Sequence, residues 1–484
     1  MSGRQSNSSA KPPKRGLFNR IVSHISQYIP NPKKATKASN KIAPSNSPPL
    51  SQLPPLSQLP PLSQLSQPPQ LSQLPPLPAS RQSRLRPLPI QYDLDSRIKR
   101  YELIQETLIK LNENDQNQLT KYTCLEKIYV NNTYYIKDII TLDKKIGSQS
   151  ENGAIYKAVI EGNYINIATK VMKSSVENKL ETILMKAITE KIILTKKSKH
   201  FVIMYCYSLC KELEKYKADY ALANFNELAK NDLGYLLQQE EILKDEELLY
   251  NLLLQAFLSI GTFHNFTGYI HKDCMWTNFL YFDNTENNGG DMICYYKYIF
   301  DNKMYYLKSC KYNLMIYDFG LSFDIINCSD EDIINNILSY YEMIGKKFNA
   351  SDVLKFKSDF NDYRLDELIT LITNDYLRIL PFFTNTSFNK LSKKFEHLPN
   401  NDISEFIITI SDKIFGLKII TSNDKDNRHI LFKNIFVAVL DICIEQFKTM
   451  GIFTDKLPEG SIIINDQPFE LYSRTKLDIA LRDI

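Results

Sequence analysis

Two stretches of the sequence place carboxylates among apolar residues, at points where a helix or a strand should end. In the first, "YIHKDCMWTNFLYFD" at 269–283, Asp273 and Asn278 stand five positions apart between aromatic and aliphatic side chains. In the second, "LMIYDFGLS" at 314–322, Asp318 ends an apolar run and a glycine follows two positions later. Burying a carboxylate is costly unless a cation or a donor pairs with it. Both stretches therefore indicate carboxylates beside a metal-bound phosphate, although a solvated loop tip and a simple turn are the plainer alternatives.

Phosphoryl transfer from a nucleotide also needs a backbone cradle and a lysine for the phosphates, and candidates for both precede these stretches. Gly147 and Gly153 bound a short segment between two expected strands, where a cradle and an ordinary hairpin turn are both compatible with the sequence. In "INIATK", Ala168 and Lys170 share one face of a strand. The small side chain leaves room for a base while the ammonium reaches the phosphates. Lys173 has the opposite parity and is the weaker candidate.

A lysine in this role needs an acidic partner, which the helix expected at 176–197 can supply. Glu190 shares one face of that helix with an apolar stripe. The apolar members of the stripe are Ile183, Ala187 and Leu194. We expect Glu190 to pair with Lys170, with Glu181 as the alternative. A third option leaves Glu190 at the rim, bonded to a lysine of its own helix.

The elements that must position these residues change character along the chain. Alternating side chains and Gly or Asn turns predict strands in the front half, at 133–147, 153–173, 201–209 and 219–226. Helical periodicity dominates the back half, at 245–265, 365–375, 404–414 and 431–449. A hairpin at 293–309 should turn at Asp301-Asn302. Strands followed by helices predict an α+β fold.

In this order, the motifs resemble those of the eukaryotic-type protein kinase superfamily. "GAIYKA" resembles the end of the glycine-rich loop, "IHKDCMWTN" resembles the catalytic loop H-R-D-x-x-x-x-N, and "DFG" is intact. The resemblance spans about residues 140–375 and implies a bilobal protein-kinase-like fold, with a small antiparallel β-sheet N-lobe and a larger helical C-lobe. The implied domains are an extension at 96–139, an N-lobe at 140–232, and a C-lobe at 233–484 with an insertion at 284–311. The insertion resembles those of diverged kinases from large DNA viruses, of the iridovirus and poxvirus kinds.

The resemblance implies a role for each catalytic position. Lys170 would hold the α- and β-phosphates of ATP and pair with Glu190. Asp273 would orient the substrate hydroxyl. Asn278 and Asp318 would bind Mg²⁺. ATP and Mg²⁺ are therefore the expected cofactors.

The resemblance also implies which residues contact the nucleotide and which support the helical half. The expected ATP-binding residues of the sheet are Gly147, Gly153, Ile155, Ala168 and Lys170. The stretch "NELAKNDL" resembles the hinge, where Glu227 and Leu228 would offer backbone groups to adenine and Asp232 would reach the ribose. Asp362 would be the aspartate that begins the central helix of the C-lobe.

The implied activity is transfer of the γ-phosphate of Mg-ATP to protein hydroxyls, with serine and threonine as the favoured acceptors. Several positions depart from the family pattern. Serines replace two glycines of the glycine-rich loop, Lys272 replaces an arginine, Met275 stands where a lysine is usual, and no A-P-E follows the DFG. These departures leave open a pseudokinase that serves as a binding scaffold. A kinase-like small-molecule phosphotransferase is the third alternative, although its H-G-D and D-x-D motifs do not occur in the sequence.

The N-terminal hundred residues differ in composition from the rest. Residues 1–100 carry 15 Lys and Arg but 2 Asp and Glu, a net charge of +13, whereas the remainder has a net charge of −9. The hexamer PPLSQL repeats through 48–65, and such a segment favours extended polyproline II. Residues 16–29 predict a basic amphipathic helix. We expect 1–95 to be a disordered arm. The repeat is compatible with a stiff spacer or a docking strip for an SH3- or WW-type domain, but a low-complexity insertion without a binding role is the favoured alternative. The charge of the arm suits a membrane surface or an acidic partner, with a solubilising tail as the alternative, and no specific nucleic acid is expected.

Cysteine use and hydropathy predict the compartment. The eight cysteines form no CxxC pair, and Cys206 and Cys210 are the closest neighbours. This pattern predicts free thiols in a reducing compartment and argues against a disulfide framework. No window reaches the about 18 consecutive apolar residues that a membrane span needs, and no secretory signal is evident. We expect a cytoplasmic protein, in the host cytoplasm or the virion if the chain is viral.

Overall fold

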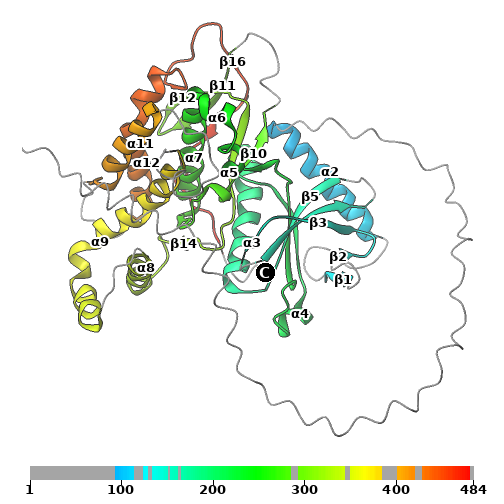
Figure 1. Cartoon of the computed structure of the whole chain (residues 1–484). Helices are drawn as coiled ribbons and strands as arrows, with labels where there is room; N and C mark the ends of the chain where they lie inside the picture. The colour runs from blue at the N-terminus through cyan, green and yellow to red at the C-terminus, as the bar shows by residue number, and fades with distance from the viewer. Residues whose placement is uncertain are drawn as a thin grey trace, which may run out of the picture. The chain divides into compact units, whose positions relative to one another are not determined.

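The computed structural model describes most of the chain beyond the N-terminal arm. The described residues are 93–113, 124–128, 133–150, 153–161, 165–284, 293–343, 349–383, 401–419 and 428–479. The PPLSQL repeats and the helix expected at 16–29 lie outside them. Within the described residues the predicted α+β class is confirmed, because an antiparallel sheet precedes a region made mostly of helices (Figure 1).

Seven antiparallel strands form the first sheet. They are β1 (Glu126–Ile128), β2 (Thr133–Ile136), β3 (Ile140–Ser150), β4 (Gly153–Ile160), β5 (Ile165–Met172), β6 (Met204–Leu209) and β7 (Leu222–Asn226). Their order in the sheet is β1-β2-β3-β4-β5-β7-β6. Strand β5 lies between β4 and β7, and it alternates side chains between the two faces of the sheet. The candidate Lys170 is therefore carried by an inner strand, where neighbours on both sides fix its direction.

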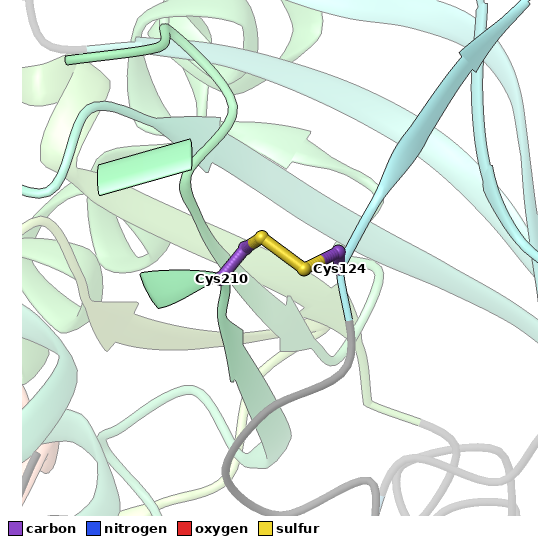
Figure 2. Close-up of a disulfide and its surroundings, with 2 residues drawn as sticks. All are labelled: Cys124 and Cys210. Atoms are coloured by element: carbon purple, nitrogen blue, oxygen red, sulfur yellow. A yellow bond between two sulfur atoms is a disulfide. The ribbon is translucent and has the colours of Figure 1, made fainter. Parts of the chain in front are cut away.

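A disulfide joins the two edges of this sheet, as Figure 2 shows. Cys124 precedes the edge strand β1, and Cys210 directly follows β6, the strand at the other edge. Their Cα atoms are 4.7 Å apart although 86 positions separate them in the sequence. The prediction of free thiols is wrong for this pair, because the sheet curls until its edges meet and brings distant cysteines together. The other six cysteines are free.

One helix before the sheet packs against it. Helix α2 (Leu94–Glu113) runs beside the strands, in blue in Figure 1. Arg100 Nη2 donates to the carbonyl oxygen of Asn166 at 2.8 Å, and Gln105 Nε2 donates to that of Tyr205 at 2.5 Å. Side chains of α2 thus bond the backbone at β5 and β6, and part of the predicted extension is integral to the fold.

The helical region is built around α7 (Glu246–Thr267), which is buried from Leu248 to Thr267. Gly268 ends this helix with a φ of +79°, and a Cβ there would lie 2.4 Å from Ile326 Cδ1, so no other residue fits without a shift. The other long helices are α8 (Asp330–Met343), α9 (Ala350–Ile379), α11 (Asn401–Phe415) and α12 (Arg428–Thr449). In the part of the chain that the structure describes, no helix combines the length and apolarity needed to cross a bilayer.

In the described part of the second half, three small sheets complete the fold. Strand β10 (Phe279–Asp283) pairs with β13 (Tyr312–Ile316) and β8 (Asn231–Asp232), and β9 (Tyr269–Ile270) pairs with β14 (Phe323–Asp324). The predicted hairpin is confirmed as β11 (Cys294–Phe300) and β12 (Lys303–Lys308), with Asp301 and Asn302 in left-handed turn geometry. The hairpin is not isolated, because β15 (Phe453–Thr454), β16 (Ile462–Ile463) and β17 (Phe469–Glu470) pair with it.

Short helices connect these elements. The π-helical turn η5 (Thr189–Ile193) continues α3 (Val176–Ile188), and α4 (Lys211–Lys215) lies between β6 and β7. The chain then forms α5 (Leu233–Leu236) and α6 (Glu240–Lys244), and the 3-10 turns η6 (Trp276–Asn278) and η8 (Leu380–Phe383) follow later. Buried Gln255 of α7 fixes β13, since its Oε1 accepts the N–H of Leu314 at 2.8 Å and its Nε2 donates to the carbonyl of Tyr312 at 3.0 Å. These bonds fix the position of β13 and therefore of Asp318, which follows it.

Candidate functional site

Lys170 is the centre of a buried charge cluster. Its Nζ lies 2.9 Å and 2.7 Å from the two carboxylate oxygens of Glu181, and 2.9 Å from Asp318 Oδ1. Glu181 is fully buried and Lys170 nearly so, whereas the side chain of Asp318 keeps 33% of its surface exposed. The three residues come from β5, α3 and the end of β13. The cluster therefore unites residues that are 11 and 148 positions from Lys170 in the sequence.

The prediction that Glu190 pairs with Lys170 is wrong, and the alternative Glu181 takes that place. Glu190 is exposed and lies in the π-helical turn η5, not on the buried face of α3. That face carries Glu181, Leu184, Met185 and Ile188, which follow one another at helical spacing. Three residues separate the end of β5 from the start of helix α3, and Glu181 lies in the second turn of that helix. Glu181 is therefore close to Lys170, which lies near the end of β5. The wider turn of η5 also shifts the helical register that the sequence pattern had assumed.

Electrostatics within the cluster favour a charged lysine. Burial opposes the ammonium form of Lys170, but the carboxylates of Glu181 and Asp318 outweigh it and raise the pKa of Lys170 above its ordinary value. Burial raises the pKa of Glu181 to about 7, against the opposing effect of the Lys170 charge. Although burial acts in the other direction, Lys170 holds the pKa of Asp318 below its ordinary value. The cluster thus keeps a cation in a buried position.

Asp273 and Asn278 form a second, adjoining group. The side-chain nitrogen of Asn278 donates to Asp273 Oδ2 at 2.9 Å and to the Asp273 carbonyl oxygen at 2.8 Å. Arg378 Nη2 donates to Asp273 Oδ1 at 2.9 Å, and Arg378 Nη1 bonds the carbonyl oxygen of Lys272. The side chain of Asp273 stays 26% exposed. This network fixes the direction of the carboxylate while leaving part of it accessible.

The backbone before Asp273 is held by a buried carboxylate that sequence reasoning missed. Asp375 of α9 accepts the N–H of His271 at 2.6 Å and that of Lys272 at 2.8 Å, one on each oxygen. His264 Nε2 lies 2.8 Å from Asp375 Oδ2. Hydrogen bonds from these groups hold the pKa of Asp375 below its ordinary value although burial opposes this. Asp375 is the aspartate that supports this loop. The prediction that Asp362 begins the central helix is wrong, because Asp362 lies inside α9 (Ala350–Ile379) and not at its start.

His271 connects the two groups. Its Nδ1 accepts the N–H of Asp273 at 3.2 Å, and its Nε2 lies 2.9 Å from the carbonyl oxygen of Tyr317. Because a backbone N–H only donates and a carbonyl only accepts, the ring carries its proton on Nε2. The N–H of Tyr317 in turn donates to the carbonyl oxygen of Asn278 at 2.9 Å. Since Asp318 follows Tyr317, the predicted residues Asp273, Asn278 and Asp318 lie together where β10 and β13 adjoin.

Two residues of this region have left-handed backbone geometry. Lys272 and Asp318 both have a φ of +65°. Such geometry in a non-glycine residue costs about 1–2 kcal/mol and persists only where the surroundings impose it. The hydrogen bonds of Asp375 and Lys170 impose it here, and they hold the residues on either side of the site in fixed directions.

The predicted nucleotide-contacting residues of the sheet share one face. Ile155 is directly opposite Lys170 across β4 and β5, and Ala168 lies two positions before Lys170 on β5. Residues opposite each other in a sheet, and residues two apart on one strand, point to the same side. Ile155 and Ala168 are half-buried. A flat apolar group could therefore lie against them with Lys170 at its edge.

The two glycines lie in the β3–β4 hairpin, as predicted. Gly147 has a φ of +70° with open space around it, so the backbone angle alone requires glycine there. At Gly153 a Cβ would lie 2.5 Å from the carbonyl oxygen of Val171, so close backbone approach requires glycine. The hairpin is thus drawn against β5, the strand of Lys170.

The predicted hinge residues differ in whether their polar groups already bond other residues of the protein. The Glu227 side chain is buried, and the backbone N–H of Glu227 donates to the carbonyl oxygen of Ile203 at 2.9 Å. The backbone carbonyl of Glu227 bonds no described residue and could accept a bond from a ligand. Leu228 is half-buried outside any strand, and its backbone groups bond no described residue. Asp232 caps α5, since its Oδ1 accepts the N–H of Tyr235 at 2.8 Å. Leu228 therefore fits the predicted role best, whereas Asp232 is partly committed to the cap.

The donor set fits a magnesium ion that shares its ligands with a phosphate. Mg²⁺ prefers oxygen ligands and usually takes one or two from protein, with the rest from phosphates and water. Asp318 supplies a carboxylate, and Oδ1 of Asn278 accepts no bond from a described residue because the amide nitrogen faces Asp273. Within the described ranges, no group of three or more His, Cys, Asp or Glu side chains could hold a metal alone. The arrangement suits a metal brought with a nucleotide and does not form a protein-only cage.

Two further residues of α9 matter that the sequence motifs do not indicate. Asp375 had a readable signal, because it continues the apolar spacing of Leu368, Ile372 and Ile379 as a carboxylate on a buried face. Arg378 had no such signal, since one arginine near the end of a helix is ordinary.

Comparison with protein-family models and with curated proteins finds no match for this chain.

Proposed function

We propose that this chain is an ATP-dependent protein kinase with a bilobal fold, in which the seven-stranded sheet and the helical region are the two lobes. The observation that carries the proposal is the bonding of Lys170 Nζ to both Glu181, at 2.7 Å, and Asp318, at 2.9 Å. A buried lysine held by two carboxylates, one of them partly exposed, has the charge and position to hold phosphate oxygens. The adjoining Asp273 and Asn278 supply the remaining groups that phosphoryl transfer requires.

Each residue has a role that its contacts support. Lys170, oriented by Glu181, would bind the α- and β-phosphates. Asn278 and Asp318 would hold Mg²⁺, which when bound neutralises charge on the phosphates. Asp273, fixed in direction by its partners, would accept a hydrogen bond from the attacking hydroxyl and orient it toward the γ-phosphate.

Arg378 adds a cation beside the position of transfer. Its guanidinium bonds Asp273 at 2.9 Å and is 17% exposed. Met275 is half-buried and supplies no charge. We assign to Arg378 the fixing of the Asp273 carboxylate, so that the direction of the hydroxyl is set before transfer.

We propose serine and threonine hydroxyls of proteins as the acceptors. We also propose a location in the host cytoplasm or the virion, because the insertion resembles those of diverged kinases from large DNA viruses. The Cys124–Cys210 disulfide weighs against a strongly reducing compartment. Binding of an SH3- or WW-type domain, or of a membrane surface or acidic partner, by the arm stays a prediction.

Purified full-length protein with Mg²⁺ and γ-labelled ATP, assayed for self-phosphorylation and for labelling of a mixed protein substrate, tests the proposal. We expect label transfer by the wild type and at least a hundredfold loss in Asp273→Asn, because a positioned acid or base contributes about 10²–10⁴-fold. Asp366→Asn, at an exposed carboxylate of α9, is the matched control and should transfer normally. Equal transfer by wild type and Asp273→Asn would contradict the assignment.

One observation favours a second function, a pseudokinase that binds nucleotide as a scaffold. Both oxygens of Asp273 already accept hydrogen bonds, one from Arg378 and one from Asn278. If these bonds persist with substrate, Asp273 has less capacity to receive a hydroxyl proton. This alternative predicts that Mg-ATP raises the melting temperature while no label is transferred, whereas the kinase shows both effects.

A further inference from the structure

The sheet and the segment after β7 are tied to helix α2 by one arginine. Arg97 lies in the first turns of α2, and its side chain is 3% exposed, as is that of Glu227. Arg97 Nε bonds Glu227 Oε1 at 2.9 Å, and Arg97 Nη2 bonds Glu227 Oε2 at 2.8 Å. This is a two-bond, fork-to-fork pair between residues 130 positions apart. Such a pair fixes direction as well as distance.

Two of the three remaining N–H donors of Arg97 are also used. Nη1 donates to the carbonyl oxygen of Lys199 at 3.0 Å, and Nη2 donates to that of Phe201 at 2.6 Å. The guanidinium carbon lies 5.6 Å from the ring centre of Phe282 in β10. One side chain of α2 thus contacts the segment before β6, the residue after β7 and a strand of the helical region.

Glu227 transmits this restraint to the backbone. Its Oε2 also accepts the N–H of Ile203 at 3.1 Å, and its own N–H donates to the Ile203 carbonyl at 2.9 Å. Glu227 directly follows β7, whose Asn226 pairs with Ala168 of β5. The next residue, Leu228, has backbone groups that bond no described residue. The side chain of Glu227 therefore fixes the direction of the backbone N–H and carbonyl of Leu228, which follow the strand paired with Ala168.

We propose that Arg97 is a positioning residue that fixes the backbone of residues 227–229 for recognition of the nucleotide base. This inference rests on the proposed nucleotide-dependent function. A buried ion pair is often replaceable by apolar side chains without loss of stability, so its value here lies in directing the backbone. Helix α2, which precedes the region of family resemblance, is then part of the nucleotide site.

Binding of adenosine, ADP and Mg-ATP by titration calorimetry separates this role from others. We expect Arg97→Met to weaken binding of all three ligands by a similar factor, about tenfold, as when one hydrogen bond to the base weakens. Lys170→Met should weaken only the ligands that carry phosphates. Lys99→Met, at an exposed lysine of α2, is the matched control and should bind as the wild type does.

The double variant Arg97→Met/Glu227→Met distinguishes positioning from stability. Two apolar side chains should restore most of the unfolding free energy that Arg97→Met loses, while adenosine affinity stays about tenfold weaker. Recovery of adenosine affinity together with stability would overturn the inference, as would wild-type affinity in folded Arg97→Met. If wild-type protein binds none of the three ligands, the proposed function itself fails, which is a separate result.

Discussion

Replacing Asp375 by asparagine tests whether a buried carboxylate holds the loop that carries Asp273. The carboxylate is fully buried and accepts the N–H groups of His271 and Lys272, with His264 as a third partner. Asparagine keeps the shape, but its amide nitrogen must replace one oxygen and then faces an N–H donor. An unsatisfied buried donor pair costs about 1–3 kcal/mol, and loss of charge weakens the other bonds by about 1 kcal/mol each. We expect a total of about 3–5 kcal/mol, as for other broken buried pairs.

Urea unfolding and amide hydrogen exchange measure the two parts of this prediction. Asp375→Asn should lower the free energy of unfolding by about 3–5 kcal/mol and still fold, since domains have about 5–15 kcal/mol. The amides of His271 and Lys272 should exchange faster at urea concentrations where the fold is intact. Label transfer should fall as well, because the backbone of Asp273 loses its support.

Asp366→Asn controls for a charge change on the same helix. Its carboxylate is exposed, and the substitution should change the unfolding free energy by less than about 0.5 kcal/mol. A loss below about 1 kcal/mol in Asp375→Asn, with unchanged exchange at His271 and Lys272, would refute the reasoning. It would mean that the loop holds its conformation without the carboxylate.

Three further predictions concern the cluster, the disulfide and acid stability. Asp318→Asn and Lys170→Met should each abolish label transfer while circular dichroism stays unchanged; normal transfer in either would remove that residue from the site. Reducing the disulfide, or Cys210→Ser, should lower the unfolding free energy by about 4.5 kcal/mol, because the disulfide joins residues with a sequence separation of 86, and an unchanged urea midpoint would contradict this. Burial lowers the pKa of His200 from 6.5 to about 3, so the unfolded chain binds more protons between these values. His200 should therefore contribute a fall in stability of about 1.4 kcal/mol per unit as pH drops from 6.5 to 3, and His200→Gln should remove that contribution in urea titrations at each pH.

Local pattern predicted the elements and most candidate residues, because these depend on short-range periodicity. The alternation in "INIATK" correctly placed Ala168 and Lys170 on one face of β5 and set Lys173 outside the cluster, where it is exposed and pairs with Asp219. The apolar run before Asp318 correctly predicted a strand end. Each of these conclusions needed only a few neighbouring residues.

The ion-pair and disulfide partners of these residues were harder to predict, because they depend on how distant elements pack together. Glu181 and Glu190 both lie on plausible helical stripes, and only the start of α3 directly after β5, with the turn at η5, selects Glu181. The Cys124–Cys210 pair depends on the curl of a seven-stranded sheet, which no local spacing encodes. The same holds for Arg97, whose partner Glu227 is 130 positions away.

If Lys170 binds phosphate as proposed, its present bonds indicate how the site must change when the phosphate enters. An ammonium has three N–H donors, and Glu181 takes two of them while Asp318 takes the third. A phosphate oxygen must therefore displace one acceptor. Glu181 is fully buried and has Lys170 as its partner cation, so leaving the bond would strand a buried carboxylate. Asp318 is 33% exposed and can turn toward a metal ion, so the Lys170–Asp318 bond is the one that should break. Asp318 follows β13, the strand paired with β10, and β10 follows the loop of Asp273. Breaking the Lys170–Asp318 bond would therefore couple phosphate binding at Lys170 in β5 to the position of Asp318 beside the Asp273 loop.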